Sequence, residues 1–244
     1  MRRFAPAFAA FLYALPAWAE LPPGLESARL LPGWVEGGKR ISALELVLSP
    51  GWKTYWRSPG DAGIPPSFDW EGDAAVEVHW PQPALIDSAG MVTLGYEDRV
   101  IVPLTASGDG PLAAKIELGL CEAVCVPADL SLVAPPPGDA PDPAILAAME
   151  TVSQVSAVQP ACTITEISDG MQVAVTLPQP ARAAAIELPG TEIWVSQPDL
   201  ADGVALSDLV PPQAAPFDLD PAQIVLTVIG TDGAAMEYRG CHES

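Results

Sequence analysis

Short runs in which apolar and polar residues alternate recur along the whole chain, and turn-forming residues separate them. The sequence of 244 residues contains 28 prolines and 20 glycines, and only 17% of its residues are charged. Alternation with a period of two is typical of half-buried strands, and frequent prolines interrupt long helices. The pattern predicts an all-β chain built from many short strands.

The candidate strands form two groups on either side of a proline-rich segment. Those of the first group are 43–49, 74–80, 99–106, 112–120 and 126–133, and those of the second are 162–168, 171–177, 183–188, 192–196, 223–230 and 235–240. Turn signals at this spacing are typical of sandwiches. We therefore predict two tandem β-sandwich domains.

The segment between the two groups reads "APPPGDAPDP", and its prolines lack the amide hydrogen that a sheet or helix interior uses. We interpret residues 135–143 as an interdomain linker, with one domain over 20–134 and the second over 144–244. Residues 143–155 form the one helix that the sequence predicts, with Asp142 as its N-cap and Pro143 at its first position.

The first twenty residues have the order of a secretory signal peptide. Arg2 and Arg3 precede an apolar run, and Ala17-Trp18-Ala19 fits the small-x-small rule before a cleavage point. A membrane anchor is the alternative, but the run is shorter than the roughly 20 residues of a spanning helix and "LPPGLES" follows it. We expect cleavage of residues 1–19 and export to an oxidising compartment, where disulfides persist.

The mature chain is strongly acidic. Loss of Arg2 and Arg3 leaves 9 basic residues against 31 acidic ones, a formal charge of −22. Nucleic acid is therefore excluded as a partner. A solvated acidic surface fits an exported monomer, and a docking partner is expected to be neutral or basic where the two meet.

Two of the four cysteines, Cys121 and Cys125, lie four positions apart in "LGLCEAVCVP". In a straight strand they would be ~13 Å apart, far beyond the ~4.4 to 6.8 Å between alpha carbons that a disulfide tolerates. They can bond only if Glu122-Ala123-Val124 turns the chain back, as a hairpin or as one helical turn. Strand-like flanks on both sides favour the hairpin.

Spacing leaves three uses open for this pair. A loop this small adds little chain-entropy stabilisation, whereas two neighbouring thiols suit exchange chemistry, so redox use is favoured over a structural bond. Glu122 beside Cys121 disfavours a strongly acidic thiol. Cu(I) binding ranks third because it needs another ligand, and neither His79 nor His242 is persuasive. We predict no metal site and no cofactor.

Cys162 and Cys241 suit a structural disulfide. Joining them would close a loop of ~80 residues, which contributes about 4 to 4.5 kcal/mol in the chain-entropy model. Each lies at one end of the second domain. We predict that they bond to each other.

Three motifs in order resemble a known family. They are "GWKTYWRSPGDAGIPPSFDW" at 51–70, "LGYEDRVIVPL" at 94–104 and "LGLCEAVCVP" at 118–127. Together they resemble the N-terminal periplasmic domain of the thiol:disulfide interchange protein DsbD and its relative ScsB. The resemblance implies an immunoglobulin-like sandwich with a redox cysteine pair, over residues 21 to 134. The second domain is loosely similar to the second sandwich of ScsB-type regions.

The resemblance also implies partners and roles. Electrons would come from a membrane donor of DsbD, ScsB or CcdA type and pass to periplasmic thioredoxin-fold proteins, in a protein-disulfide reductase type of exchange. Cys125 would form the mixed disulfide and Cys121 would resolve it. Because the chain has no membrane domain or C-terminal thioredoxin domain, we expect the donor to be a separate protein. DsbD spaces its cysteines more widely, so the geometry is expected to follow ScsB.

A cap loop shields the cysteine pair in this family. Its counterpart would lie at residues 89–95, with Met91, Val92 or Leu94 as the covering side chain. Tyr55 and Trp56 would pack about the site.

Three hypotheses of different classes follow. The first is a periplasmic thiol-disulfide exchange module that works through Cys121 and Cys125. The second is a Cu(I)-binding or metal-stress protein that uses the same cysteines. The third is a non-catalytic interaction sandwich in which both disulfides are structural.

The two predicted disulfides should differ in their resistance to reduction. We expect mild reductant to open Cys121–Cys125 while Cys162–Cys241 stays closed, because small-loop disulfides are more easily reduced than buried structural ones. Mass spectrometry of alkylated peptides measures both. Equal resistance of the two bonds would contradict the redox hypothesis.

Overall fold

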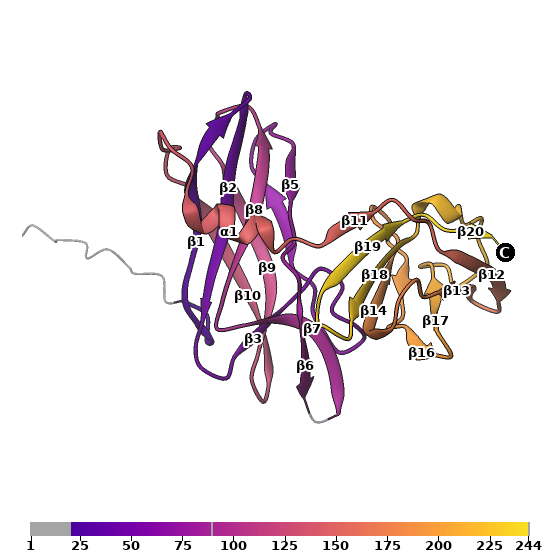
Figure 1. Ribbon diagram of the computed structural model, residues 1–244. Helices are drawn as coiled ribbons and strands as arrows, with labels where there is room; N and C mark the ends of the chain where they lie inside the picture. The colour runs from indigo at the N-terminus through magenta and orange to yellow at the C-terminus, as the bar shows by residue number, and fades with distance from the viewer. Residues whose placement is uncertain (1–20, 89, 244) are drawn as a thin grey trace, which may run out of the picture.

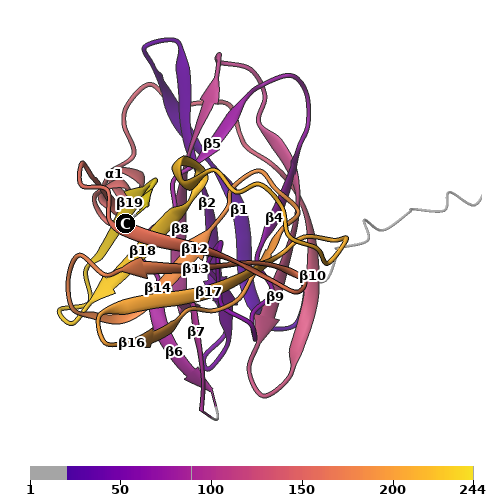
Figure 2. The same ribbon diagram turned by 90° about the vertical axis from the view of Figure 1, so that its right-hand side faces the viewer.

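The computed structural model describes residues 21–88 and 90–243, and the predicted signal peptide lies outside them. Two β-sandwiches lie side by side, the first in indigo and magenta and the second in orange and yellow (Figure 1). The strands of the second cross those of the first (Figure 2). Among the described residues, no helix has the length and apolar character needed to cross a membrane. The prediction of an all-β fold with two tandem sandwiches is confirmed.

One sheet of the first sandwich has the order β1-β2-β8-β5. Its strands are β1 (Leu25–Glu36), β2 (Lys39–Leu48), β8 (Arg99–Ser107) and β5 (Val76–Val78). The sequence did not predict β1, because Pro32 and Gly33 in its middle look like a turn. In the structure, Pro32 and Gly33 lie within β1, where the register of the β1–β2 pairing shifts between Leu31 and Trp34. A side chain at Gly33 would lie 1.7 Å from the Ile41 carbonyl oxygen, so only glycine fits there.

The other sheet of the first sandwich carries the close cysteine pair. Its order is β10-β9-β3-β7-β6, made of β10 (Cys125–Val133), β9 (Ala113–Cys121), β3 (Lys53–Tyr55), β7 (Met91–Glu97) and β6 (Ala84–Ser88), and β4 (Ser67–Trp70) also pairs with β9. Apolar side chains of both sheets, among them Leu104, Ile116 and Leu120, form the main core. Their alternation along each strand buries one face and exposes the other.

The proline-rich segment and the helix both pack on the first sandwich. The backbone N–H of Gly138 donates to the Gly33 carbonyl at 2.8 Å, and the buried Arg40 guanidinium donates to the Pro135 carbonyl. Helix α1 (Pro143–Glu150) has Asp142 as its N-cap, as predicted, and its fully buried Ile145 packs against Trp34. We therefore propose that the boundary between the domains follows α1.

The helix ends five residues earlier than the sequence predicted. Residues 154–156 instead form β11 (Gln154–Ser156), which pairs in parallel with β19 (Ala235–Arg239) of the second sandwich. A continued helix would forgo these sheet hydrogen bonds, so tertiary pairing overrides the local helix preference.

The second sandwich also consists of two sheets. One has the order β11-β19-β18-β14, with β18 (Val225–Gly230) and β14 (Ala181–Glu187). The other has the order β15-β17-β13-β12-β20, with β15 (Trp194–Val195), β17 (Val204–Val210), β13 (Gly170–Thr176), β12 (Ala161–Ile167) and β20 (His242–Glu243); β16 (Asp199–Ala201) also pairs with β17. A short 3₁₀ helix, η1 (Pro221–Gln223), precedes β18.

A buried carboxylate is neutralised on the face of β2 that lies opposite the main core, the face against which α1 packs. Glu45, only 3% exposed, accepts hydrogen bonds from Arg29 and Arg99. Burial alone would raise the pKa of Glu45, but the hydrogen bonds from and charges of the two arginines outweigh it and hold the pKa below its usual range. Neighbouring strands supply both cations, because β2 lies between β1 and β8.

Replacing Glu45 with glutamine should therefore have a pH-dependent effect. A carboxyl whose folded pKa is lowered stabilises the fold above its unfolded pKa, and this stabilisation is lost as the pH falls through the folded value. We expect Glu45→Gln to reduce the free energy of unfolding at pH 7 by about 1 to 3 kcal/mol. Urea denaturation at a series of pH values should show the difference shrinking in acid, and a difference independent of pH would contradict this assignment.

Candidate functional site

The hairpin of β9 and β10 brings Cys121 and Cys125 directly opposite each other. They are the first register pair of the ladder, and a disulfide joins them with their alpha carbons 4.1 Å apart. The predicted hairpin is confirmed, with Glu122-Ala123-Val124 as its exposed turn. The sequence alone could not decide whether that turn would form, because it contains no glycine.

The two sulfur-bearing residues differ in exposure. Cys121 is 1% exposed, whereas Cys125 is exposed at the start of the outermost strand of its sheet. An incoming thiolate must approach one sulfur in line with the bond and expel the other. The arrangement therefore permits attack on Cys125 with Cys121 as the leaving sulfur.

Tyr55 contacts both sulfurs. Its hydroxyl oxygen lies 3.0 Å from Cys121 Sγ and 3.4 Å from Cys125 Sγ. Disulfide sulfurs carry no hydrogen, so the hydroxyl is the donor. Burial raises the pKa of Tyr55 above its usual value, which keeps that hydrogen in place around neutral pH. A donor aimed at Cys121 can stabilise negative charge that develops there when the bond breaks.

A loop covers the Tyr55 ring. Strands β3 and β4 pair with the same edge of β9, and residues 56–66 between them leave the sheet. We call residues 56–66 the covering segment. A methyl group added at Gly119 would lie 2.8 Å from Ile64 Cβ and 3.1 Å from the Tyr55 ring. Glycine at this position therefore lets the ring and the covering segment pack directly on β9.

Lys53 is a buried cation on the same sheet face, which the sequence analysis did not single out. It is the register partner of Cys121 on one side and of Glu97 on the other. Its ammonium group lies 5.8 Å from the centroid of the Tyr55 ring. The sequence does contain a signal for Lys53: it lies two residues before Tyr55, and side chains two apart in a strand lie on the same face of the sheet.

The predicted cap residues occupy mixed positions. Leu94 is 5% exposed and belongs to the main core, whereas Val92 is half-buried. Both line a groove of about 750 Å³ between the two sandwiches. The side chain of Met91 lies outside the described residues. The capping role of these three residues stays a prediction. Trp56, predicted to pack about the site, is fully buried in the core.

The second disulfide joins Cys162 to Cys241, as predicted, with alpha carbons 5.8 Å apart. Both residues are buried in the core of the second sandwich. The bond links β12 in one sheet to the chain just after β19 in the other, which suits a structural role.

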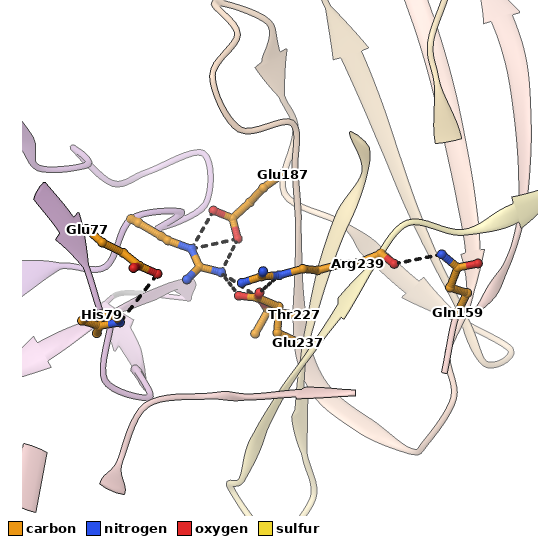
Figure 3. Close-up of polar contacts among 8 residues, drawn as sticks. Glu77, His79, Gln159, Glu187, Thr227, Glu237 and Arg239 are labelled. Carbon is orange, nitrogen blue, oxygen red and sulfur yellow. Dashed lines mark hydrogen bonds and ion pairs between the residues drawn. The ribbon is translucent and has the colours of Figure 1, made fainter. Parts of the chain in front are cut away.

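The histidines lie apart from the cysteine pair. His79 shares a hydrogen bond with the Thr105 hydroxyl at 2.8 Å, and Glu77 lies beside it (Figure 3). His242 belongs to β20, which pairs with β12. Within residues 21–88 and 90–243, no group of three or more metal-ligating side chains could hold a metal ion.

Comparisons with known proteins agree with this geometry. A family model described as "Thiol:disulfide interchange protein DsbD, N-terminal" matches residues 27–137. The crystal structure of the N-terminal periplasmic domain of ScsB from Proteus mirabilis is similar at 26% identity, with a TM-score of 0.63, over 89% of this chain and 92% of that chain. Domains 5–6 of the S-layer protein SbsC align at 12% identity over 90% of this chain and 99% of that chain, but their TM-score of 0.22 supports no argument. A comparison with curated proteins gave no match.

Removing the Tyr55 hydroxyl should slow reduction of the disulfide. Tyr55→Phe keeps the ring that packs on Gly119 but loses the donor to Cys121, so the leaving sulfur is less stabilised. We expect dithiothreitol to reduce Cys121–Cys125 roughly tenfold more slowly in this variant. The rate can be followed by alkylating the free thiols in samples taken at successive times. Tyr238→Phe in the second sandwich is the control. A rate equal to that of the unmodified protein would show that the hydroxyl has no part in exchange.

Proposed function

We propose that residues 27–137, which match the DsbD N-terminal family model and resemble ScsB, form a redox domain of that type, and that the protein relays electrons from a membrane donor to periplasmic thioredoxin-fold proteins through Cys121 and Cys125. One observation carries the proposal most directly. The hairpin disulfide joins a buried cysteine to an exposed one, with a hydroxyl donor beside the sulfur of the buried cysteine. A purely structural disulfide needs neither feature.

The exchange runs in two steps in each direction. In the reduced module, the Cys125 thiolate attacks a disulfide of the acceptor and forms a mixed disulfide, and one acceptor sulfur leaves as a thiolate. The Cys121 thiolate then attacks Cys125 Sγ and releases the second acceptor sulfur. Two electrons have passed to the acceptor, and Cys121–Cys125 is again a disulfide. A dithiol of the membrane donor reverses both steps.

The cellular location follows from the same relatives. The similar ScsB structure is a periplasmic domain, which supports a periplasmic location for this protein. Export by a cleaved signal peptide over residues 1–19 completes the proposal. In the periplasm the acidic surface would favour acceptors that are neutral or basic around their reactive cysteine.

Trapping experiments test the division of labour between the cysteines. We expect Cys121→Ala to form a stable mixed disulfide with a thioredoxin-fold protein that lacks its own resolving cysteine, because exposed Cys125 stays available. Cys125→Ala should form roughly tenfold less, since Cys121 is buried. Non-reducing electrophoresis and mass spectrometry quantify the adducts. Similar yields, or a reversed order, would refute the assignment, and no adduct with either variant would refute the function.

A further inference from the structure

The second sandwich reaches the surroundings of the disulfide through the covering segment. This segment packs on Tyr55, which contacts both sulfurs, and in residues 56–66 no helix or strand forms. Two backbone hydrogen bonds attach it to β7, from Trp56 N–H to the Leu94 carbonyl and from Leu94 N–H to the Pro59 carbonyl, both at 3.0 Å. Its remaining described polar attachments lead to the second sandwich.

Arg57 is the first of these attachments. Its guanidinium binds Glu187 through two nitrogens, at 2.9 and 3.0 Å, and donates to Glu237 at 2.8 Å. The three side chains are 22%, 14% and 8% exposed, so water competes weakly for these bonds. Bidentate pairing of this kind fixes the orientation of a guanidinium as well as its position.

The acceptors are arranged on a single sheet of the second sandwich. Glu187 ends β14, Thr227 lies in β18, and Glu237 lies in β19. Thr227 and Glu237 are register partners, and Thr227 is a third acceptor for Arg57 at 3.4 Å. Figure 3 shows Glu187, Thr227, Glu237 and Arg239 converging from these strands. The pairing of β14, β18 and β19 therefore holds the three acceptors of Arg57 close together.

Charge balance requires a cation at this contact. Burial raises the pKa of Glu187, and the Arg57 charge only partly offsets this. For Glu237, burial is outweighed by hydrogen bonds from Arg239 and Arg57, so its pKa lies below the usual range. Without Arg57, Glu237 would keep its contact with Arg239, but Glu187 would lose the cation that binds it, which is unfavourable for a buried carboxylate.

Asp61 is the second attachment. Its carboxylate accepts a hydrogen bond from the backbone N–H of Gln197 at 2.8 Å. Gly60 beside it approaches the Gln197 side chain so closely that an added methyl group would lie 2.6 Å from Gln197 Oε1. The second sandwich thus holds the covering segment at two points, four residues apart.

We propose that the second sandwich is a positioning domain for the redox site, which holds the covering segment on Tyr55 through Arg57 and Asp61. A fixed covering segment keeps water away from the Tyr55 hydroxyl and directs its hydrogen bond to Cys121. Arg57, Glu187 and Asp61 are positioning residues, since none contacts a sulfur in the described contacts. This inference rests on the proposed exchange function and gives the second sandwich a part in it.

The test compares the reduction rates of two variants. The single variant, Asp61→Ala, removes an exposed side chain and with it the attachment to Gln197. The double variant, Asp61→Ala with Glu187→Gln, also weakens the attachment through Arg57. We expect hydrogen exchange in residues 56–66 to become about tenfold faster in the double variant. Reduction of Cys121–Cys125 by dithiothreitol should slow about threefold, with a smaller effect in the single variant. If the double variant does not fold, the same two measurements are made on Asp61→Ala alone.

A double-mutant cycle separates positioning from general destabilisation. In the Tyr55→Phe background, the same changes should leave the reduction rate unaltered, because the hydroxyl through which they act is absent. Glu45→Gln is the matched control: it also disturbs a buried carboxylate bound by arginines, but within the first sandwich, and it should not alter the rate.

Several results would overturn the proposal. They are unchanged exchange in residues 56–66, an unchanged reduction rate, or equal slowing in the Tyr55 and Tyr55→Phe backgrounds. A failure of the proposed function would appear differently, as a lack of mixed disulfides with protein partners. The present test uses only a small dithiol, so the two failures can be told apart.

Discussion

The antiparallel pairing of β9 with β10 is the constraint on which the site depends. Backbone groups must find partners in a buried sheet, and this pairing places Cys121 opposite Cys125. Because β9 is internal and β10 is an edge strand, the same ladder buries Cys121 and leaves Cys125 exposed. Pro127 on β10 lacks an amide hydrogen and suits an edge, where it also discourages pairing with other chains.

Three consecutive residues connect the disulfide to the rest of the molecule. Tyr55 faces the sulfurs, Trp56 is fully buried in the core, and Arg57 reaches the second sandwich. The guanidinium of Arg57 also lies 4.4 Å from the centre of the Trp56 ring. A displacement of the second sandwich would therefore act on residues next to Tyr55 through packed and ion-paired contacts, which is the kind of contiguous physical path that coupling requires.

The chain is strongly acidic, and several of its arginines bind buried groups. One carboxylate, Glu45, lies between two arginines on the outer face of a sheet of the first sandwich, and one guanidinium, Arg57, lies between two carboxylates at the contact of the sandwiches. Arg40 instead binds backbone carbonyls and fastens the proline-rich segment to the first sandwich. Such buried ionic contacts add geometric specificity, since removing one partner leaves an uncompensated charge.

The sequence by itself determined what depends on neighbours along the chain. Alternation predicted the strands of seven or more residues except β1, β7 and β17, Asp142 and Pro143 marked the start of the helix, and the spacing of Cys121 and Cys125 required a reversal of the chain for the two to bond. The tertiary structure decided what depends on distant partners: the passage of β1 through Pro32 and Gly33, the early end of the helix, and the attachment of the proline-rich segment. The Arg57 contacts are the clearest case, because their acceptors lie 130 and 180 residues away. No local pattern marks such a pair, since it forms only when the two sandwiches pack together in one orientation.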